Sequence, residues 1–513
     1  MNHNIRIIGG LTGLKIIGAV LGVIYMVLQV RYFGTSRAIE VFFAAQSVLY
    51  VIISLTQSGQ LAEIFLPEYL KIRNSKGTSV AHAAYSVVAN RLSAIVIIVL
   101  CIAFILAPFI IRLFIPGFST EDQYQATYLF RAFLPFIFLQ IQLAFLNTVL
   151  NAEQVFGRTE ATNIVNGIIS ILILIFLYQD LEVWALVVSS YVGIIIQIAL
   201  SLIYAYKKGI RYYFVWVLPS FNHKVFFKTI LSTLSYTIAT QGLNWAMVAS
   251  ISFLPQGMLA IYKYVEKLYP KLNSILVQPF STVFFTKISN KISSESDARH
   301  LKLKMVNLQE YSLLFGLFIF GLSIAAGKES LSILWKGSNF TSADLAMAYQ
   351  ILCAFFIAFT FQLFYALNRK YSVALGLARY NYNYQTYAQL LSATVAFPLI
   401  YFFNIEGLLS AIVFSRLALI SVPVYVNLAK GQKFYKAPPL SFSIKFLMGL
   451  IFLPIVVLIT KAHICLWCHI EGIWFDIANI ISWVFFTICL YFLIINLFKL
   501  NFIFKLKKEI FGS

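Results

Sequence analysis

The chain has 513 residues, of which 60% are hydrophobic and only 11% are charged. Its mean hydropathy of +0.83 excludes a water-soluble globular protein, because such a protein needs far more charge to cover its surface. The net charge of +20 would suit nucleic acid, but the positions of the basic residues described below exclude that partner.

Long apolar segments recur from one end of the chain to the other, and many approach the roughly 20 residues that cross a bilayer as a helix. They predict an all-α integral membrane protein with about 14 transmembrane helices. The third span extends backwards from residue 92, because residues 79–91 also have a helical pattern. The first apolar run is too long for a cleavable signal and lacks a cleavage site. The predicted spans are residues 7–30, 38–56, 92–114, 125–150, 162–178, 183–206, 229–254, 258–286, 309–326, 345–367, 386–403, 407–427, 443–461 and 473–497.

The basic residues are unevenly distributed between the loops. With the N-terminus inside, roughly 25 of them fall in cytoplasmic segments and about 6 in outer loops, which is the bias of the positive-inside rule. We therefore expect a multi-pass protein with both termini in the cytoplasm. A basic inner face also suits anionic lipid headgroups, so membrane lipids are expected partners. The cytoplasmic basic residues include Lys71, Arg73, Lys76, Lys207, Lys208, Arg211, Lys224, Lys228, Lys287, Lys291, Arg299, Lys302, Lys304, Lys505, Lys507 and Lys508.

Two stretches about 222 residues apart resemble each other: "FIPGFSTEDQYQATYLFRAFLPF" from residue 114 and "LWKGSNFTSADLAMAYQILCAFF" from residue 334. In both, a turn with Phe and Ser or Thr leads into a helix, with Asp122 or Asp344 near its N-terminus, where the helix dipole favours a carboxylate. Further on, "LEVWALVVSSYVGIIIQ" (181–197) parallels "IEGLLSAIVFSRLALIS" (405–421). A chance likeness of apolar hairpins is the alternative explanation.

The repeat predicts the domain organisation. An offset of six helices gives two lobes of the same orientation, an architecture that transporters use. We predict an N-terminal lobe at 1–222, a C-terminal lobe at 223–436, and two extra spans with a basic tail at 437–513.

Several charged residues lie within predicted spans, where ionised groups are costly unless they meet water or a partner. Lys15 lies midway along the first span, and Arg131 lies early in the fourth. The stretch "YKYVEKLYPK" (262–271) carries the largest group. Its Lys263, Lys267 and Lys271 recur at i, i+4 and i+8 and share one helical face. Glu266 is one turn from Lys263 and is placed to pair with it.

These lysines have two interpretations. They could extend to the outer headgroups, which explains Lys263 best and Lys271 worst, since Lys271 lies too far along the helix. Alternatively, they line a water-filled cationic cavity for an anionic ligand such as a pyrophosphate, with Lys15 facing them. Arg416, in the twelfth span, is a further charge within the membrane.

Four motifs in the first third of the chain resemble the MurJ/MviN family of lipid II flippases, a family of the multidrug/oligosaccharidyl-lipid/polysaccharide exporter superfamily. The motifs are "VRYFGTSRAIEVFFAA" (30–45), "LAEIFLPEY" (61–69), "APFIIRLFIPGF" (107–118) and "FLNTVLNAEQVF" (145–156). The resemblance is good over residues 10–175 and weak afterwards, although the plan of 14 spans fits throughout.

The resemblance implies two six-helix lobes in a V, with two extra helices that form a groove for a lipid tail. It implies alternating access that carries an undecaprenyl-pyrophosphate-linked saccharide from the inner to the outer leaflet of a bacterial inner membrane. Glu40 occupies the acidic position that the family has at the start of the second span. Glu266 and Lys267 match its acid–base pair in the eighth span.

The chain departs from the family at three arginine positions. Ala19 and Tyr25 stand where lipid II members carry arginines on the first helix, and another arginine is missing near Ile53 and Ser54. Lys15, one turn before Ala19, replaces one of these charges. The substrate is therefore either lipid II or a related oligosaccharide of the O-antigen or capsule kind.

Two further classes compete with a flippase. A cation-coupled exporter of small drugs on the same fold would need a carboxylate-rich cavity, but Lys exceeds Glu in this one. A polysaccharide polymerase or ligase would need a large outer loop, and the outer loops here are short. The chain also lacks the glycine-rich nucleotide loops and the GxSxG and HExxH motifs, so we expect neither an enzyme nor a cofactor.

The remaining expectations concern metals and partners. "HICLWCH" (463–469) admits a haem attachment, a zinc site, a local disulfide or free thiols. We expect no metal. We expect a monomer whose partners are the lipid-linked saccharide and membrane lipids, and a coupling cation is compatible with this.

Overall fold

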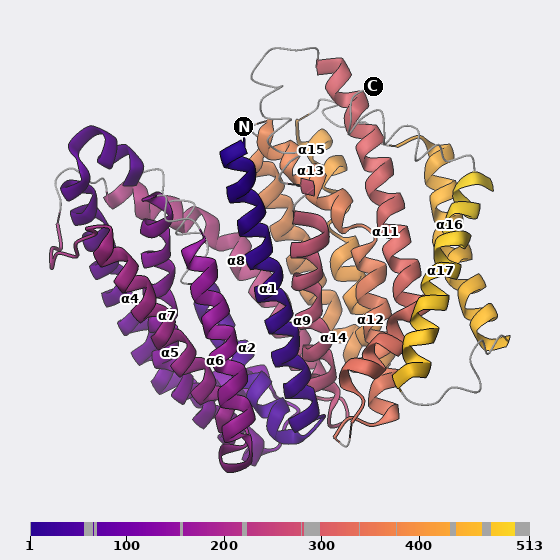
Figure 1. The fold of residues 1–513 in the computed structure, drawn as a ribbon, viewed down its shortest axis with the longest axis horizontal. Coiled ribbons are helices and arrows are strands. Elements are labelled where there is room, and N and C mark those ends of the chain that lie inside the picture. The colour runs from indigo at the N-terminus through magenta and orange to yellow at the C-terminus, as the bar shows by residue number, and fades with distance from the viewer. Residues whose placement is uncertain are drawn as a thin grey trace. The chain divides into compact units, whose positions relative to one another are not determined.

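In the computed structural model, the described part of the chain consists of helices and the loops between them (Figure 1). Within the part of the chain that it describes, the only β-structure is an isolated bridge between Gly337 and Phe340. The all-α membrane fold predicted from hydropathy is therefore confirmed. The description omits residues 1, 56–64, 66–68, 154–156, 218–222, 279, 282–297, 338, 376, 431–437, 464–472 and 498–513.

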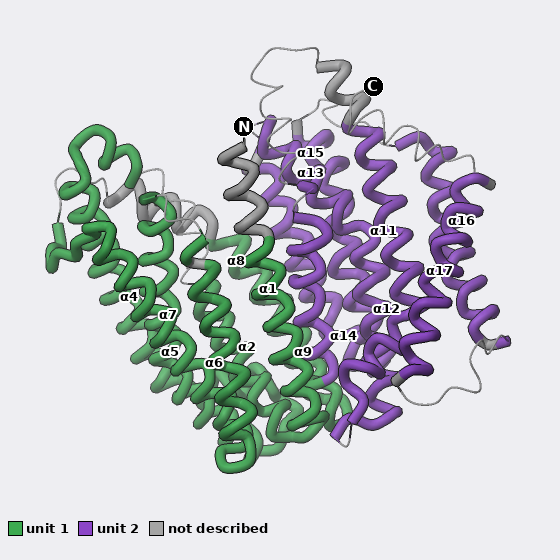
Figure 2. The backbone as a smooth tube through the Cα atoms, viewed as in Figure 1, with its two compact units in different colours: residues 1–260 green, residues 261–513 purple. Residues whose placement is uncertain are grey.

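The chain divides into two compact units, Met1–Ala260 and Ile261–Ser513 (Figure 2). Unit 1 contains α1 Asn2–Phe33, α2 Arg37–Leu55, α4 Thr78–Phe114, α5 Thr120–Ala152, α6 Arg158–Leu181, α7 Trp184–Lys207 and α8 His223–Ile251. Within it α1 packs against α6 and α2 against α5, while α5 also contacts α4 and α7. Apolar and amphipathic helices can form such a bundle in lipid because each helix makes the hydrogen bonds of its own backbone.

Unit 2 continues from α9, which begins at Met258. Its helices are α9 Met258–Leu272, the short π-helix η1 Asn273–Val277, α11 Ala298–Trp335, α12 Ser342–Phe359, α13 Gln362–Ala374, α14 Ala378–Leu417, α15 Val422–Lys430, α16 Leu440–His463 and α17 Ile473–Leu497. The last two helices pack on α11 through a core that includes Leu317, Leu453 and Ile494. A half-buried ion pair between Lys461 and Glu329, 2.8 Å long, joins α16 to α11.

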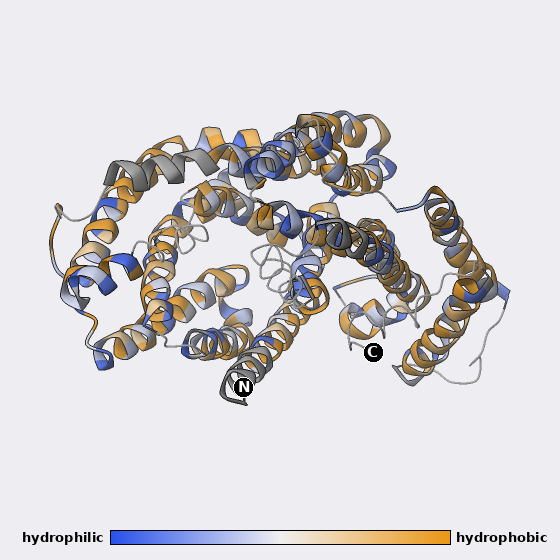
Figure 3. Ribbon diagram, turned by 90° about the horizontal axis from the view of Figure 1, so that it is seen from above, coloured by the Kyte–Doolittle hydropathy of each residue, from blue (hydrophilic) through white to orange (hydrophobic). Residues whose placement is uncertain are grey.

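Eleven of the described helices are long and apolar enough to cross a membrane. In Figure 3 the hydrophobic colour recurs along all the helices of the ribbon, with hydrophilic residues between. Two predicted spans, 386–403 and 407–427, begin within the single helix α14, which is interrupted at Asn404 by a non-helical backbone. The predicted spans 229–254 and 258–286 correspond to α8 and to α9 with η1, and residues 279 and 282–286 of the latter lie outside the described part.

The internal repeat is visible in the backbone itself. Ser119 caps α5 by accepting a hydrogen bond from the Asp122 N–H, and Thr341 caps α12 in the same way with Asp344. The offset from Asp122 to Asp344 is 222 positions. The same offset separates α5, Thr120–Ala152, from the apolar stretch Ser342–Ala374 that contains α12 and α13.

A strained turn recurs at the same offset. Glu182 ends α6 with φ 47° and ψ −126°, and Asn404 interrupts α14 with φ 51° and ψ −123°. Positive φ is uncommon for residues other than glycine, so its recurrence at matching places supports a duplication over a chance likeness. The predicted lobe limits at 222 and 436 stay a prediction, since the compact units describe packing and not ancestry.

Candidate functional site

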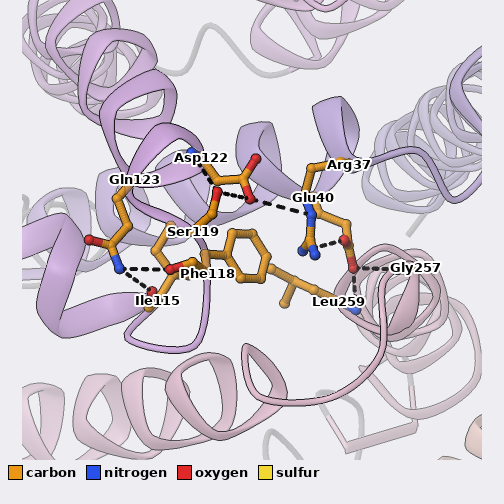
Figure 4. Close-up of polar contacts among 9 residues, drawn as sticks. All are labelled: Arg37, Glu40, Ile115, Phe118, Ser119, Asp122, Gln123, Gly257 and Leu259. Carbon is orange, nitrogen blue, oxygen red and sulfur yellow. Dashed lines mark hydrogen bonds and ion pairs between the residues drawn. The ribbon is translucent and has the colours of Figure 1, made fainter.

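Glu40 lies in the first turn of α2 with its carboxylate almost wholly buried, at 1% exposure. One oxygen, Oε1, accepts hydrogen bonds from the backbone N–H groups of Gly257 at 2.9 Å and Leu259 at 3.0 Å. The other, Oε2, accepts from Arg37 Nη1 at 2.9 Å. Figure 4 shows these contacts. A buried carboxylate is tolerated when it is paired and hydrogen-bonded in this manner.

The turn that contains Gly257 fits this carboxylate closely. Gly257 has φ +94°, which favours glycine, and a Cβ there would lie 3.0 Å from the Cβ of Thr35. The N–H groups of Gly257 and Leu259 belong to the start of α9, where a helix leaves its first donors without internal partners. Glu40 therefore caps these two N–H groups, which belong to unit 1, in the position where the helix dipole favours negative charge.

Arg37 extends the cluster toward the turn between α4 and α5. Its Nε lies 3.6 Å from Asp122 Oδ2, and its guanidinium lies 4.3 Å from the centre of the Phe118 ring. The Gln123 side chain donates to the Ile115 and Phe118 carbonyls at 3.1 Å, as Figure 4 also shows. Arg37 thus joins the carboxylates of α2 and α5 by one cation.

A second contact joins two of these turns directly. The Gly117 N–H donates to Ser252 Oγ at 2.9 Å, and a Cβ on Gly117 would lie only 2.4 Å from the Ser252 carbonyl oxygen. Position 117 therefore requires glycine because the two turns approach closely there, and not because of its backbone conformation. The turns at 115–119 and 252–257 and the start of α2 after the turn at 34–36 are thus joined by hydrogen bonds and ion pairs within unit 1. We call these three turns the turn cluster.

The lysine-rich stretch on α9 has a different arrangement in unit 2. Lys263 Nζ lies 2.8 Å from Glu266 Oε2, so the pair expected from their spacing is formed. The Tyr262 hydroxyl donates to the other oxygen of Glu266 at 3.2 Å. Lys267 and Lys271 are half-buried on the same helical face. With three lysines and one glutamate, the charged face of α9 is net positive.

The end of α9 on either side of Lys271 is held by a chain of polar side chains. The Tyr269 hydroxyl donates to Gln362 Oε1 at 2.8 Å, and Gln362 Nε2 donates to Asn273 Oδ1 at 3.2 Å. Arg416 stacks over the Tyr269 ring at 4.9 Å. Pro270 and η1 follow in the backbone. Arg416 and the lysines therefore share one neighbourhood of unit 2, which adds to its positive charge.

The other predicted site residues lie apart from these groups. Lys15 is exposed on α1. Arg131 contacts α4, where its Nε donates to the Phe104 carbonyl at 3.2 Å and its guanidinium stacks on the Phe104 ring at 4.8 Å. The substrate-binding role predicted for Lys15, Glu40, Arg131 and the α9 residues stays a prediction.

Sequence reasoning missed the role of Arg37. Its i, i+3 spacing to Glu40 is a signal for a pair, but its bridge to Asp122 has no sequence signature. The Cys465 and Cys468 motif lies outside the described residues. In the remainder that the structure describes, no group of three His, Cys, Asp or Glu side chains could hold a metal.

Comparison with known proteins adds to this geometry. Residues 29–474 match the model of the family described as "Lipid II flippase MurJ". A protein of Rickettsia prowazekii (strain Madrid E), named "Probable lipid II flippase MurJ", is 25% identical over 316 residues, which are 58% of this chain and 59% of that protein. The match thus spans about three-fifths of that relative's length. A protein of the same name from Haemophilus influenzae is 21% identical over 67% of this chain and 70% of its own.

Solved structures show the same fold. "Lipid II flippase MurJ, inward closed conformation" aligns with a TM-score of 0.74 at 19% identity, covering 96% of this chain and 99% of the other. An inward-facing multidrug resistance MATE transporter aligns with a TM-score of 0.64 at 13% identity, covering 82% of this chain and 94% of the other.

Proposed function

Because the chain belongs to the MurJ lipid II flippase family, whose model matches residues 29–474, we propose that it moves an undecaprenyl-pyrophosphate-linked saccharide from the inner to the outer leaflet. It does so by alternating access and forms no covalent intermediate. The saccharide is lipid II or a related O-antigen or capsule oligosaccharide.

The face of α9 is the observation that carries this proposal. Lys263, Lys267 and Lys271 lie on one face of α9 together with the single carboxylate of Glu266. Glu266 forms an ion pair with Lys263, and with three lysines against one glutamate the face as a whole carries net positive charge. A pyrophosphate carries the negative charge and the acceptor oxygens that such a face binds. A cation-exporting site would need the opposite charge.

The repeat supports alternating access. Two halves of one chain with the same caps and the same strained turn can each move as a body about a substrate held at midplane. Since both halves lie in one chain, we propose a monomer. The lobes 1–222 and 223–436 and the added segment 437–513 are the bodies of this proposal, and a coupling cation remains compatible with it.

Depletion of the protein in cells should make the lipid-linked saccharide accumulate in the inner leaflet. Without a carrier, the charged headgroup and sugars cannot cross the apolar core at a useful rate. The measurement is the accessibility of the saccharide to an enzyme or label added outside intact cells. Unchanged sidedness of the glycolipid together with altered sensitivity to drugs would instead support the exporter alternative.

We also propose that the membrane is a bacterial inner membrane and that both chain ends are cytoplasmic. The support is the imbalance of roughly 25 basic residues against about 6. On this topology the turn cluster, which follows α1, α4 and α8, lies on the outer side. The exposed residues 74–76 lie on the inner side.

A cysteine placed at Ser75 should react with an impermeant maleimide only after the membrane is permeabilised. A cysteine at Glu121, exposed at the start of α5, should react in intact cells and is the matched control. Both are made in a chain whose own cysteines are replaced by alanine. Labelling of Ser75→Cys from outside with protection of Glu121→Cys would reverse the topology.

A further inference from the structure

The segment that follows α7 lies along the first turns of α4 as an extended strap. Asn90 Nδ2 donates to the Val215 carbonyl at 2.9 Å, and Arg91 Nε donates to the Trp216 carbonyl at 2.8 Å. The Tyr213 N–H donates to Ser86 Oγ at 2.9 Å. In Figures 1 and 2 this segment runs along the edge of unit 1. We call residues 207–217 the strap.

The strap exposes an aromatic face because extended backbone alternates its side chains. Tyr213 and Val215 turn partly inward. Phe214 and Trp216 are 77% and 44% exposed and pack edge to face with ring centres 6.0 Å apart. In a membrane protein, exposed aromatic side chains of this kind face either lipid or a protein partner.

The depth of the strap follows from α4. This helix has 37 residues and is therefore about 55 Å long, far longer than the roughly 30 Å of bilayer hydrocarbon. Its outward face turns apolar from Ile95, with Ile98, Ile102 and Ile105 also exposed. Asn90 is only about 7 Å before Ile95 along the axis. The hydrogen bonds of Asn90 and Arg91 thus hold Val215 and Trp216 at the edge of the hydrocarbon.

The charge of the strap changes along its length. Lys207, Lys208 and Arg211 are exposed at its beginning. The Arg211 N–H lies beside His82, which is about 13 Å farther from the hydrocarbon than Arg91. The basic end therefore lies at the depth of phosphate groups, and the aromatic end lies where Trp prefers to sit, between headgroups and acyl chains.

We propose that the strap is an anchor for anionic phospholipid, with Phe214 and Trp216 inserted at the boundary of the acyl chains and Lys207, Lys208 and Arg211 on the lipid phosphates. The proposal concerns the lipid around unit 1 and does not depend on which saccharide is carried. If the partner were a soluble protein instead, the aromatic face of the strap would be exposed to water whenever that protein is absent.

Quenching of Trp216 by brominated lipid tests the insertion. The full chain is reconstituted in vesicles of phosphatidylcholine with phosphatidylglycerol, one of them brominated near the top of its acyl chains. The signal of Trp216 is the difference in tryptophan fluorescence between the unchanged protein and the Trp216→Tyr variant. We expect Trp216 to be quenched by bromolipid and shielded from aqueous acrylamide. Quenching by acrylamide alone would place the strap in water and overturn the proposal in favour of a soluble partner.

The headgroup preference has its own measurement. Brominated phosphatidylglycerol should quench Trp216 at least about threefold more strongly than brominated phosphatidylcholine at equal mole fraction, because the basic residues of the strap attract anionic headgroups. Replacing Lys207, Lys208 and Arg211 with serine should remove the preference and leave the insertion. Trp184, at the other end of α7, is the matched control. Its signal, obtained as the difference in fluorescence between the unchanged protein and Trp184→Tyr, should show no such preference. Equal quenching by both lipids in the unchanged protein would overturn the anionic part.

Discussion

Replacing Lys267 or Lys271 with alanine should slow translocation of the lipid-linked saccharide by about tenfold to a hundredfold, because a hydrogen bond to a charged group contributes roughly 1.5–3 kcal/mol. Both residues are half-buried on the positive face of α9. Expression and thermal stability should stay near those of the unchanged protein, since a partly exposed lysine gains little from burial. The measurement is the rate of headgroup transfer across vesicles that contain the purified protein.

Two variants complete this experiment. Lys263→Ala should affect transport less, because Lys263 is engaged by Glu266, but it should lower stability. Lys76→Ala, on the exposed segment before α4, is the neutral control for loss of one positive charge. Should all three α9 variants transport like the unchanged protein, the lysines serve only to reach the headgroups, and the substrate site lies elsewhere.

Replacing Glu40 with alanine should destabilise the protein by about 3–5 kcal/mol, the usual cost of removing one partner of a buried ion pair. The change strands the N–H groups of Gly257 and Leu259 and removes the main partner of Arg37. Glu40→Gln should be milder, at about 1–3 kcal/mol, because its carbonyl oxygen still accepts both N–H groups while its amide faces Arg37. Thermal unfolding in detergent measures both.

The same variants distinguish two roles for Glu40. If Glu40 acts only by capping and pairing, its replacement should lower the midpoint of thermal unfolding, and transport should decrease as a consequence. A role in binding the saccharide predicts an unchanged midpoint of unfolding with transport lost. Asp122→Asn is the matched control. Asp122 lies 3.6 Å from Arg37, farther than Glu40 does, and the asparagine keeps an oxygen for the contact with Ser119, so this variant should lower stability less than Glu40→Ala.

Hydropathy and capping motifs could predict most of the fold, because helix formation in lipid depends on local composition. The caps at Asp122 and Asp344 follow from the sequence, and so does the Lys263–Glu266 pair. The break in α14 at Asn404 was anticipated only as a gap between two spans. Its strained conformation has no composition signal, since glycine would be the expected residue there.

The candidate site was less predictable, for a physical reason. Glu40 has backbone N–H groups as partners, 217 and 219 positions away, and a backbone donor has no residue type to recognise. The contact of Gly117 with Ser252 likewise depends on close approach of two turns. The positions of the lysines on α9 could be predicted because spacing alone sets which face they share.

The two copies of the repeated long helix differ in continuity. In the first half, α5 runs unbroken over 33 residues, whereas its counterpart ends as α12 at Phe359 and resumes as α13 at Gln362. Gly316 of α11 lies so close to this junction that a Cβ would meet the Thr360 carbonyl oxygen. One copy is thus a continuous helix despite Pro135, whereas the other is two helices joined at residues 360–361. The joint of the second copy is packed so closely against α11 that any residue larger than glycine at position 316 would have to displace it.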